Sequence, residues 1–529
     1  MPNDCITYQE SGYFTPLIVD YLNQEPQVQP FYNHFPTLEN FGQQIAEKKL
    51  NFEQSNRVVL VDTLTRQYSG IKTSALTQTN ISSLGDQNTF TVTTGHQLNL
   101  FTGPLYFLYK IVSTINLAKE LSAKYPENHF VPIYWMATED HDFEEINYFN
   151  FKGKKFRWHR DSDGAVGRLS NKGLDEFFEI FSTQLGPGIN AERIRLLFQN
   201  AYLGQENLAD ATRVLANELF GEYGLVILDA DSRELKKNFI PFIKSELQQN
   251  SSFYKVSETI AALGDYTIQV NPREINLFYL EENLRERIIF QNDTYVINNS
   301  SLRFSKEEIF DLADKHPEKF SPNVITRPLY QEVILPNLCY IGGGGEIAYW
   351  LELKSFFEAV GVTFPILLIR NSVLLATVKQ SGKADKLQLT WKDLFMKQQV
   401  LENKKIHELS EFPIDFTQQK EFLKAQFMQL ELIAQSTDKS FMGAVKAQAA
   451  KQTKGLENLE KRLLKAQKKA HQDKLDRIKT LQNELFPFGG LQERTANFAE
   501  FYLEYGNILI KTLMSRLEPL EQRFEVIIF

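Results

Sequence analysis

The spacing of hydrophobic residues predicts a strand, helix, strand unit in the first third of the chain. Residues 89–97 are rich in β-branched residues, which favour a strand, and a short Gly-containing turn follows them. Residues 103–121 then repeat apolar side chains at intervals of three and four, the pattern of an amphipathic helix, and 130–138 form a second apolar run. Two strands joined by a crossover helix pair in parallel, so the pattern predicts an α/β core.

The same pattern occurs twice more along the chain. An apolar run within 224–239 ends at Asp229 before a predicted helix, and a single helix predicted over 346–361 leads into a strand that ends at Arg370. In open α/β sheets, ligands bind outside the carboxyl ends of the strands. We therefore expect the polar residues at these strand ends to meet in one pocket.

The last third of the chain has a different pattern, typical of long helices. Between Asp393 and Leu485 only three Gly or Pro residues interrupt the helical periodicity, and residues 433–441 are the expected turn between two antiparallel helices. The predicted coiled-coil seam consists of Leu456, Leu459, Leu463, Ala466 and Ala470. The predicted domains are a core over 1–385 with insertions at about 150–200 and 265–320, the second rich in strands, a coiled coil over 386–486, and a segment over 487–529 that returns to the core.

Composition and charge exclude several classes of protein. The 529 residues carry a net charge of -8 and many Phe and Tyr residues, which is typical of a globular protein and not of a nucleic-acid binder. No apolar run approaches the ~20 residues that span a bilayer, and the first residues do not form a secretory signal. The two cysteines, Cys5 and Cys339, lie far apart and suggest neither a disulfide framework nor a zinc site. We expect a cytoplasmic protein with no membrane or nucleic-acid partner.

Four ionisable residues, Glu139 to Asp142, follow the strand predicted at 130–138. They could act as acid and base, bind the amine and hydroxyl groups of a polar substrate, or hold a metal ion. The run lacks the HExxH and DxDxDG spacings, so we expect no metal site. A solvated turn is the alternative without function, but the position at a strand end favours a pocket.

Other candidate residues lie in loops that can bind anions. His96 lies where a strand gives way to a helix amino terminus, and residues 340–350 place four glycines before a helix that begins near Glu346. Arg327 could bind a carboxylate or phosphate in a bidentate way, although a surface salt bridge is the more common role of arginine. The basic stretch over 446–479 could meet a polyanion, but it lacks interleaved aromatic residues, which favours a solvated helix face.

Three segments together resemble the BshC family, the cysteine-adding enzymes of bacillithiol biosynthesis: TGHQLNLFTGPLYFLYKI, PIYWMATEDHDFEEINYF and RPLYQEVILPNLCYIGGGGEIAYWLELK. The resemblance implies a Rossmann-like parallel sheet core similar to class I aminoacyl-tRNA synthetases and nucleotidyltransferases, with inserted connecting segments. It also implies an antiparallel α-helical coiled coil and a homodimer. The implied reaction is the last step of the pathway, in which a ligase joins cysteine through an amide to the amine of glucosaminyl-malate. Family members usually read T-G-Q-Q where this chain has His96, so the resemblance gives the imidazole no specific role.

The resemblance also suggests roles for the candidate residues. We expect Asp140, His141 and Asp142 to act in catalysis. The expected substrate-binding residues are His96, Asn99, Glu139, Asp229, Arg327, Gly343, Gly344, Glu346, Tyr349 and Arg370.

The cysteine carboxylate must be activated before it can acylate an amine, and ATP or another nucleotide is one source of activation. Against it, the H-x-G-H motif of class I synthetases is absent, because Thr93 occupies its first histidine position, and no K-M-S-K-S loop is present. Two other functions remain open: a metal- or carboxylate-dependent hydrolase that uses residues 139–142, and a non-catalytic metabolite-binding scaffold whose coiled coil recruits a partner.

Overall fold

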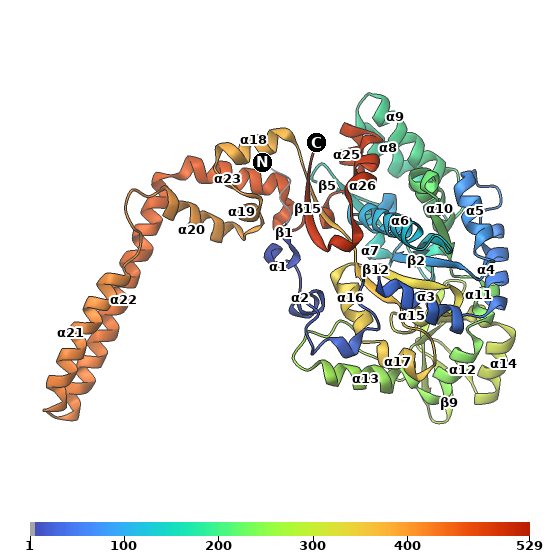
Figure 1. The fold of residues 1–529 in the computed structure, drawn as a ribbon, viewed down its shortest axis with the longest axis horizontal. Coiled ribbons are helices and arrows are strands. Elements are labelled where there is room, and N and C mark those ends of the chain that lie inside the picture. The colour runs from blue at the N-terminus through green and yellow to red at the C-terminus, as the bar shows by residue number, and fades with distance from the viewer. Residues whose placement is uncertain (1–5) are drawn as a thin grey trace.

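A five-stranded parallel sheet forms the centre of the body in the computed structural model, which describes residues 6–529 (Figure 1). The strand order is β13-β12-β2-β3-β6, and every neighbouring pair is parallel. The predicted α/β core is thus confirmed. The strands are β2 (Thr89–His96), β3 (His129–Met136), β6 (Val226–Asp229), β12 (Asn337–Gly342) and β13 (Ile366–Ile369).

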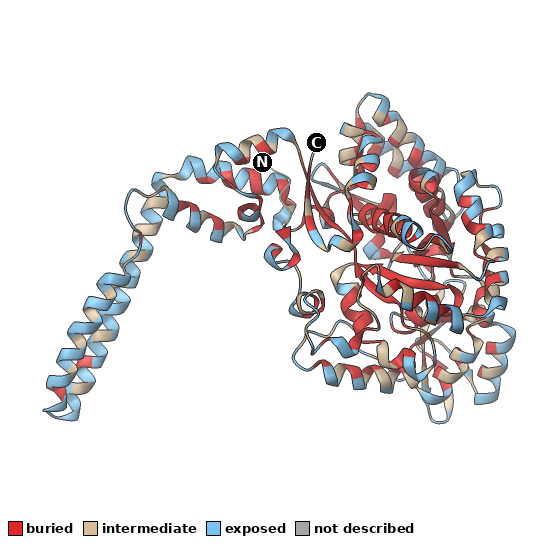
Figure 2. Ribbon diagram, in the orientation of Figure 1, coloured by how far each residue is buried: buried red, intermediate tan, exposed pale blue. Residues whose placement is uncertain are grey.

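Helices cover both faces of this sheet, which explains why its strands read as continuous apolar runs. Helix α6 (Tyr106–Lys124) packs on β2 and β3, and α3 (Asn40–Asn51) packs against β12. The sheet is accordingly the most buried part of the molecule (Figure 2). Cys339 is a buried free thiol in β12, whereas Cys5 lies outside the described residues.

The helix predicted over 346–361 is two helices, α16 (Gly344–Leu351) and α17 (Lys354–Ala359). The chain bends at Glu352, where the backbone N–H bonds to the carbonyl three residues earlier and a carboxylate oxygen accepts the backbone N–H of Gln269. The hydrogen bond from Gln269 comes from a segment distant in sequence, so the periodicity of residues 346–361 alone did not predict the break. Two other helices follow strand ends: α11 (Arg233–Lys237) and α15 (Thr326–Ile334).

The two inserted segments differ in structure. The first is mostly helical, and the second contains a five-stranded antiparallel sheet in the order β10-β9-β8-β7-β11, as its alternating pattern predicted. The first includes β4 (Tyr148–Phe151), β5 (Lys154–Arg157), α8 (Leu174–Leu185), α9 (Ile189–Phe198) and α10 (Leu208–Phe220). The second sheet consists of β7 (Leu277–Glu281), β8 (Leu284–Gln291), β9 (Thr294–Ile297), β10 (Arg303–Phe304) and β11 (Phe320–Pro322), beside α12 (Ile240–Gln249), α13 (Ser251–Leu263) and α14 (Lys306–Lys315).

A helical arm projects from the body and ends in an antiparallel hairpin of α21 (Thr417–Gln435) and α22 (Lys439–Ala470) (Figure 1). The predicted seam was wrong for Leu459, which is 53% exposed, and for Ala466 and Ala470, which are also exposed. Leu459 lies on a face of α22 that α21 leaves exposed, and beyond Glu460, where α21 begins, α22 contacts α20 (Gln398–Leu409) instead. The rest of the arm consists of α18 (Val378–Lys386), α19 (Trp391–Phe395) and α23 (Gln472–Leu485).

The segment after the arm packs on the body. Strand β15 (Arg523–Ile528) pairs with β14 (Ser372–Ala376) in parallel and with β1 (Ile6–Thr7) in an antiparallel way. Its other elements are α24 (Gln492–Thr495), α25 (Phe498–Tyr505) and α26 (Ile508–Arg516). The amino-terminal part adds α2 (Pro16–Leu22), α4 (Gln54–Gln67) and α5 (Ala75–Ser83). Within residues 6–529, no helix is both long enough and apolar enough to cross a bilayer.

Candidate active site

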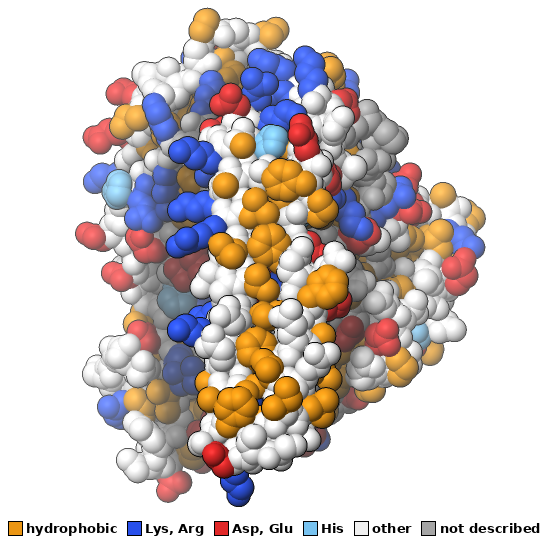
Figure 3. Space-filling view, turned by 90° about the vertical axis from the view of Figure 1, so that its left-hand side faces the viewer, with side chains coloured by type: hydrophobic (Ala, Val, Ile, Leu, Met, Phe, Trp, Pro, Cys, Tyr) orange, Lys and Arg blue, Asp and Glu red, His pale blue; other side chains and the backbone are white. Residues whose placement is uncertain are grey.

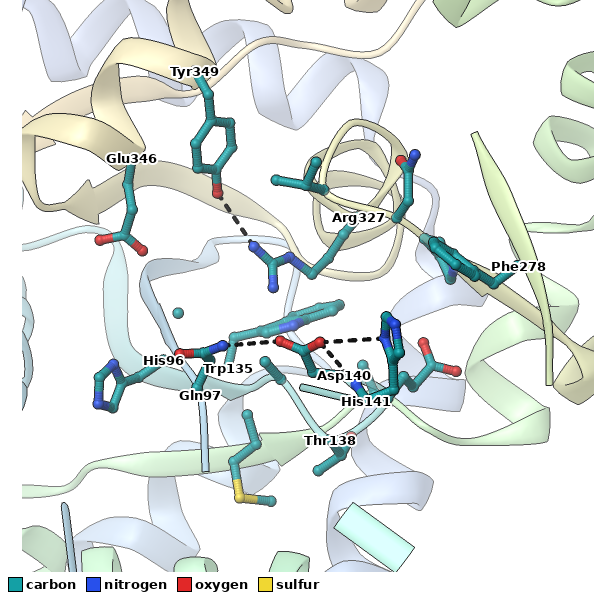
Figure 4. A pocket seen from close by; sticks show the side chains of 18 of the residues that line it. His96, Gln97, Trp135, Thr138, Asp140, His141, Phe278, Arg327, Glu346 and Tyr349 are labelled. Atoms are coloured by element: carbon teal, nitrogen blue, oxygen red, sulfur yellow. Dashed lines mark hydrogen bonds and ion pairs between the residues drawn. The ribbon is translucent and has the colours of Figure 1, made fainter. Parts of the chain in front are cut away.

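A cavity of about 740 Å³ opens at the carboxyl edge of the parallel sheet, between the body and the second inserted sheet. The ends of β2 and β3 form its floor, α15 and the start of α16 supply further walls, and β7 and β8 face them (Figure 4). The position is the one expected for a ligand in an open α/β sheet. Of the residues singled out from the sequence, it is lined by His96, Glu139, Asp140, His141, Arg327, Gly343, Glu346, Tyr349 and Arg370.

Four residues singled out from the sequence do not line the cavity. Asn99 is buried and donates a hydrogen bond to a backbone carbonyl, and Asp142 is exposed at the start of a short helix. Gly344 faces the amino-terminal helices, and Asp229 accepts a hydrogen bond from the hydroxyl of Thr138, 2.5 Å away. Three adjacent residues of the run, Glu139, Asp140 and His141, line the cavity, and only Asp142, at the start of the short helix, lies outside it.

Glu139 is held from behind by a buried cation. The ammonium of Lys236, whose side chain is fully buried, donates to Oε1 of Glu139 and lies 3.9 Å from Asp231. Burial, with a smaller contribution from the Asp231 carboxylate, raises the pKa of Glu139 to about 7 although Lys236 opposes the shift. Glu139 therefore changes charge near neutral pH.

The pKa of Asp140 is shifted in the opposite direction to that of Glu139. Its Oδ2 accepts a hydrogen bond from Gln97 at 3.1 Å, and its Oδ1 accepts the backbone N–H of His141 at 2.8 Å (Figure 4). Burial alone would raise its pKa, but these bonds and the nearby Arg285 and Arg327 hold the pKa of Asp140 below its usual value. This carboxylate stays ionised and suits an ammonium group.

A second ion pair, between the buried Lys110 and the partly exposed Glu346, lies at the amino terminus of α16. Glu346 accepts the backbone N–H of Gly343 at 2.8 Å, the ammonium of Lys110 at 2.6 Å and the hydroxyl of Tyr340 at 3.0 Å. His96 lies near this pair, and burial together with Lys110 lowers the pKa of His96 to about 3, so its imidazole is neutral.

Arginines dominate the cavity wall. Arg370 is paired with the buried Glu493 at 2.7 Å. Five further arginines form no ion pair with a carboxylate among the residues that the structure describes. These are Arg273, Arg285, Arg287, Arg327 and Arg494.

Three of the lining residues have buried polar atoms without a hydrogen-bond partner in residues 6–529. These atoms are the Nε of Arg287, the Nε of Arg370 and the Nε2 of His96. The two unpaired guanidinium nitrogens are donors and fit an anionic ligand such as a carboxylate or a phosphate.

The sequence analysis missed several lining residues. Arg285 and Arg287 alternate along β8, and such spacing puts both side chains on one face of a strand, so this signal was present. Lys110 lies in the most apolar part of α6, which also contains Lys119 and Lys124, so the helical pattern did not distinguish it. Arg494 and Arg273 come from segments distant in sequence, and no local pattern distinguishes them.

Models of one family match nearly the whole chain. "Bacillithiol biosynthesis BshC, N-terminal Rossmann-like domain" matches residues 1–371, and "Bacillithiol biosynthesis BshC, C-terminal coiled-coil domain" matches residues 373–529. The first match agrees with the parallel sheet core, and the second includes the helical arm together with the segment that returns to the body.

Relatives named "Putative cysteine ligase BshC" align along their full lengths. The protein of Flavobacterium johnsoniae is 64% identical and covers 100% of both chains. That of Cytophaga hutchinsonii is 38% identical over 97% of this chain and 96% of its own, and that of Bacillus thuringiensis is 29% identical over 94% and 95%. A solved structure titled as an arginyl-tRNA synthetase from Campylobacter jejuni covers 83% of this chain and 97% of its own at 11% identity and a TM-score of 0.22, too low to support any inference.

Proposed function

The chain belongs to the BshC family of bacillithiol biosynthesis, and from this premise we propose that it joins cysteine through an amide to the amine of glucosaminyl-malate. The cavity at the carboxyl edge of the sheet is the proposed active site. In this reaction the amine nitrogen attacks the carbonyl carbon of an activated cysteinyl group.

The observation that carries the proposal is the charge pattern of the cavity. Five arginines without carboxylate partners line the same space as Glu139 and Asp140. Glucosaminyl-malate has two carboxylates, an amine and several hydroxyl groups. The arginines suit the malyl carboxylates, and the ionised Asp140 suits an ammonium or hydroxyl group.

The end of the cavity beside α16 suits the activating group of the cysteinyl donor. The backbone N–H groups in the first turn of α16 and the partnerless Nε of Arg370 are available there for an anion. A phosphate, free or as part of a nucleotide, has the matching charge. These residues would bind and orient it, and a bound acyl phosphate or adenylate would supply a carbonyl carbon with a good leaving group.

Mass spectrometry of low-molecular-weight thiols in a strain that lacks the gene tests the proposal. We expect bacillithiol to disappear, glucosaminyl-malate to accumulate, and the wild-type chain to restore bacillithiol. The Asp140→Ala variant should fail to restore it, because the carboxylate that binds the amine is lost.

Glu144→Ala is the matched control for the test of Asp140. Glu144 lies four residues after Asp140, in the short helix Phe143–Ile146; its side chain is 70% exposed and it does not line the cavity. This variant should restore bacillithiol as the wild type does. Persistence of bacillithiol in the deletion strain would contradict the proposed step.

The two alternative functions have weaker support. Within residues 6–529, no cluster of three or more His, Cys, Asp or Glu side chains has the arrangement of a metal site. Dependence of the activity on a divalent metal at residues 139–142 is the observation that would favour a hydrolase. A non-catalytic scaffold does not explain why the cavity wall has so many unpaired cations at a sheet edge where substrates bind.

We also propose that the protein works in the cytoplasm as a homodimer. The hairpin of α21 and α22 exposes large apolar side chains, and Figure 3 shows them gathered in a stripe along the hairpin. Exposed patches of this kind mark interaction surfaces. The exposed apolar residues of the hairpin are Phe422, Met428, Leu430, Leu432, Ile433, Phe441 and Leu459.

A further inference from the structure

The hydrogen bonds of the cavity distinguish its carboxylates from one another. Three acidic residues line it, and an amide-forming enzyme needs a base that takes the proton from the attacking amine. A base needs an acceptor atom that is free to face the substrate. Glu139, Asp140 and Glu346 can therefore be compared oxygen by oxygen.

Both oxygens of Asp140 and both oxygens of Glu346 accept hydrogen bonds from the protein. The two oxygens of Asp140 accept from Gln97 and from the backbone of His141. Glu346 accepts from Lys110 and Tyr340 with Oε1 and from Lys110 and Gly343 with Oε2. The lone pairs of Glu346 are therefore all occupied, and Asp140, whose pKa is held below its usual value, accepts a proton less readily than a carboxylate with an unoccupied oxygen.

His141 is also unsuited to accept a proton. The guanidinium of Arg285 donates to Nδ1 of His141 at 2.7 Å, so the neutral ring has its own proton on Nε2. Taking up a second proton would require Nδ1 to release Arg285 and would place two cations side by side. His141 can donate a hydrogen bond to a ligand but is poorly placed as a base.

Glu139 differs from all of these groups. Its Oε1 is held by the buried Lys236, while its Oε2 accepts no hydrogen bond within residues 6–529 and the side chain lines the cavity. We propose that Glu139 is the general base of the amide-forming step and that Lys236 positions it. This inference rests on the proposed function.

The step balances as follows. The amine nitrogen of glucosaminyl-malate forms a bond to the carbonyl carbon of a cysteinyl acyl phosphate or adenylate, and the bond from that carbon to the phosphate oxygen breaks. The phosphate or nucleotide leaves with the bonding electron pair. Oε2 of Glu139 takes the proton that the nitrogen loses, which leaves a neutral amide. The raised pKa of Glu139 matches this task, since a base that titrates near pH 7 accepts and releases a proton readily.

Two isosteric substitutions test the assignment. The full-length wild type, Glu139→Gln and Asp140→Asn are expressed in the deletion strain, and the ratio of bacillithiol to glucosaminyl-malate is measured. Glu139→Gln should lower the ratio by about 100-fold or more, the usual contribution of a base. The purified variant should bind glucosaminyl-malate within about threefold of the wild type by calorimetry, whereas Asp140→Asn should bind it more weakly, because a base acts on the rate and an ammonium ligand on affinity.

The outcomes distinguish failure of the assignment of Glu139 as the base from failure of the proposed function. Restoration of the wild-type ratio by Glu139→Gln, or loss of glucosaminyl-malate binding in that variant, would overturn the assignment. If Glu139→Gln does not fold, Glu139→Asp provides the test: it keeps the charge beside Lys236 but withdraws the carboxylate by one methylene, so it should lower the ratio, and a wild-type ratio would overturn the assignment. A wild-type chain that fails to restore bacillithiol would contradict the proposed function instead.

Discussion

The cavity and the helical hairpin use charged residues in opposite ways. At the cavity, Lys236 is fully buried beside Glu139, and Lys110 is 3% exposed beside Glu346. On the hairpin, Lys420 pairs with Glu460 at 2.6 Å, but both side chains are more than a quarter exposed. The two regions also differ in the burial of their apolar side chains, which are buried around the sheet and exposed along the hairpin (Figures 2 and 3).

This difference shows which charges determine the chemistry. A buried pair is costly to separate because the remaining charge loses both water and partner, so the pair fixes the position and the pKa of its members. An exposed pair is screened by solvent and leaves its members near their ordinary behaviour. Substitutions at the two places should therefore differ in stability, in pH dependence and in binding.

The largest effect is expected when the buried cation beside Glu139 is removed. Lys236→Met leaves the carboxylates of Glu139 and Asp231 without their ammonium partner, and we expect the free energy of unfolding at pH 8 to fall by about 3 to 5 kcal/mol. Lys420→Met in the hairpin should lower it far less, because solvent screens that pair. Urea denaturation followed by circular dichroism measures both, and equal losses would contradict the distinction.

The next largest effect is a dependence of the free energy of unfolding on pH that results from the titration of Glu139. The folded-state pKa of about 7 lies above the unfolded value of 4.5, so the stability that protonated Glu139 contributes is present below pH 4.5 and is lost as the pH rises through 7. The unfolding free energy of the wild type, relative to Glu139→Gln, should therefore fall by about 2 to 3 kcal/mol between pH 5 and pH 8.

The comparison with Glu139→Gln isolates this titration from other groups. His96 acts in the opposite direction, because its depressed pKa makes the fold less stable as the pH falls below 6.5, but His96 is present in both proteins. Denaturant titrations at four pH values between 5 and 8 measure the difference. A difference that is independent of pH would show that Glu139 titrates at its ordinary value.

A smaller effect is expected when a cavity arginine without a carboxylate partner is removed. Arg327 contacts the hydroxyl of Tyr349 at 3.3 Å and forms no ion pair in the described part of the chain, so Arg327→Met should leave stability within about 1 kcal/mol of the wild type. Its loss should weaken binding of glucosaminyl-malate by about 2 kcal/mol, roughly 30-fold in Kd. Calorimetry measures the change. Arg303→Met, in β10 and outside the cavity, is the control and should bind normally.

The contrast between the cavity and the hairpin also explains which features could be predicted from the sequence. The strand ends and the position of the pocket followed from local periodicity, because the β-branched run 89–97 and the apolar run 130–138 form strands that are almost wholly buried. The other charged residues of the site did not, because Arg273, Arg494 and Lys236, which lies behind Glu139, come from segments whose relative position only the tertiary fold determines. The coiled-coil seam predicted at Leu459 was wrong for a related reason. The spacing of apolar residues identifies an apolar stripe on a helix, but it does not show which element, in the same chain or another, covers that stripe.

The smallest effect on stability concerns the apolar stripe of the hairpin. Leu432 is 64% exposed, so Leu432→Glu should change the free energy of unfolding of the isolated chain by less than about 0.5 kcal/mol. If the stripe joins two copies, the same substitution places a charge in an apolar contact and should shift the mass measured by light scattering from two chains to one. Leu50→Glu, at a site that is 86% exposed on the body, should leave the mass unchanged. A mass of one chain for the wild type, or of two chains for Leu432→Glu, would argue against this face as the dimer contact.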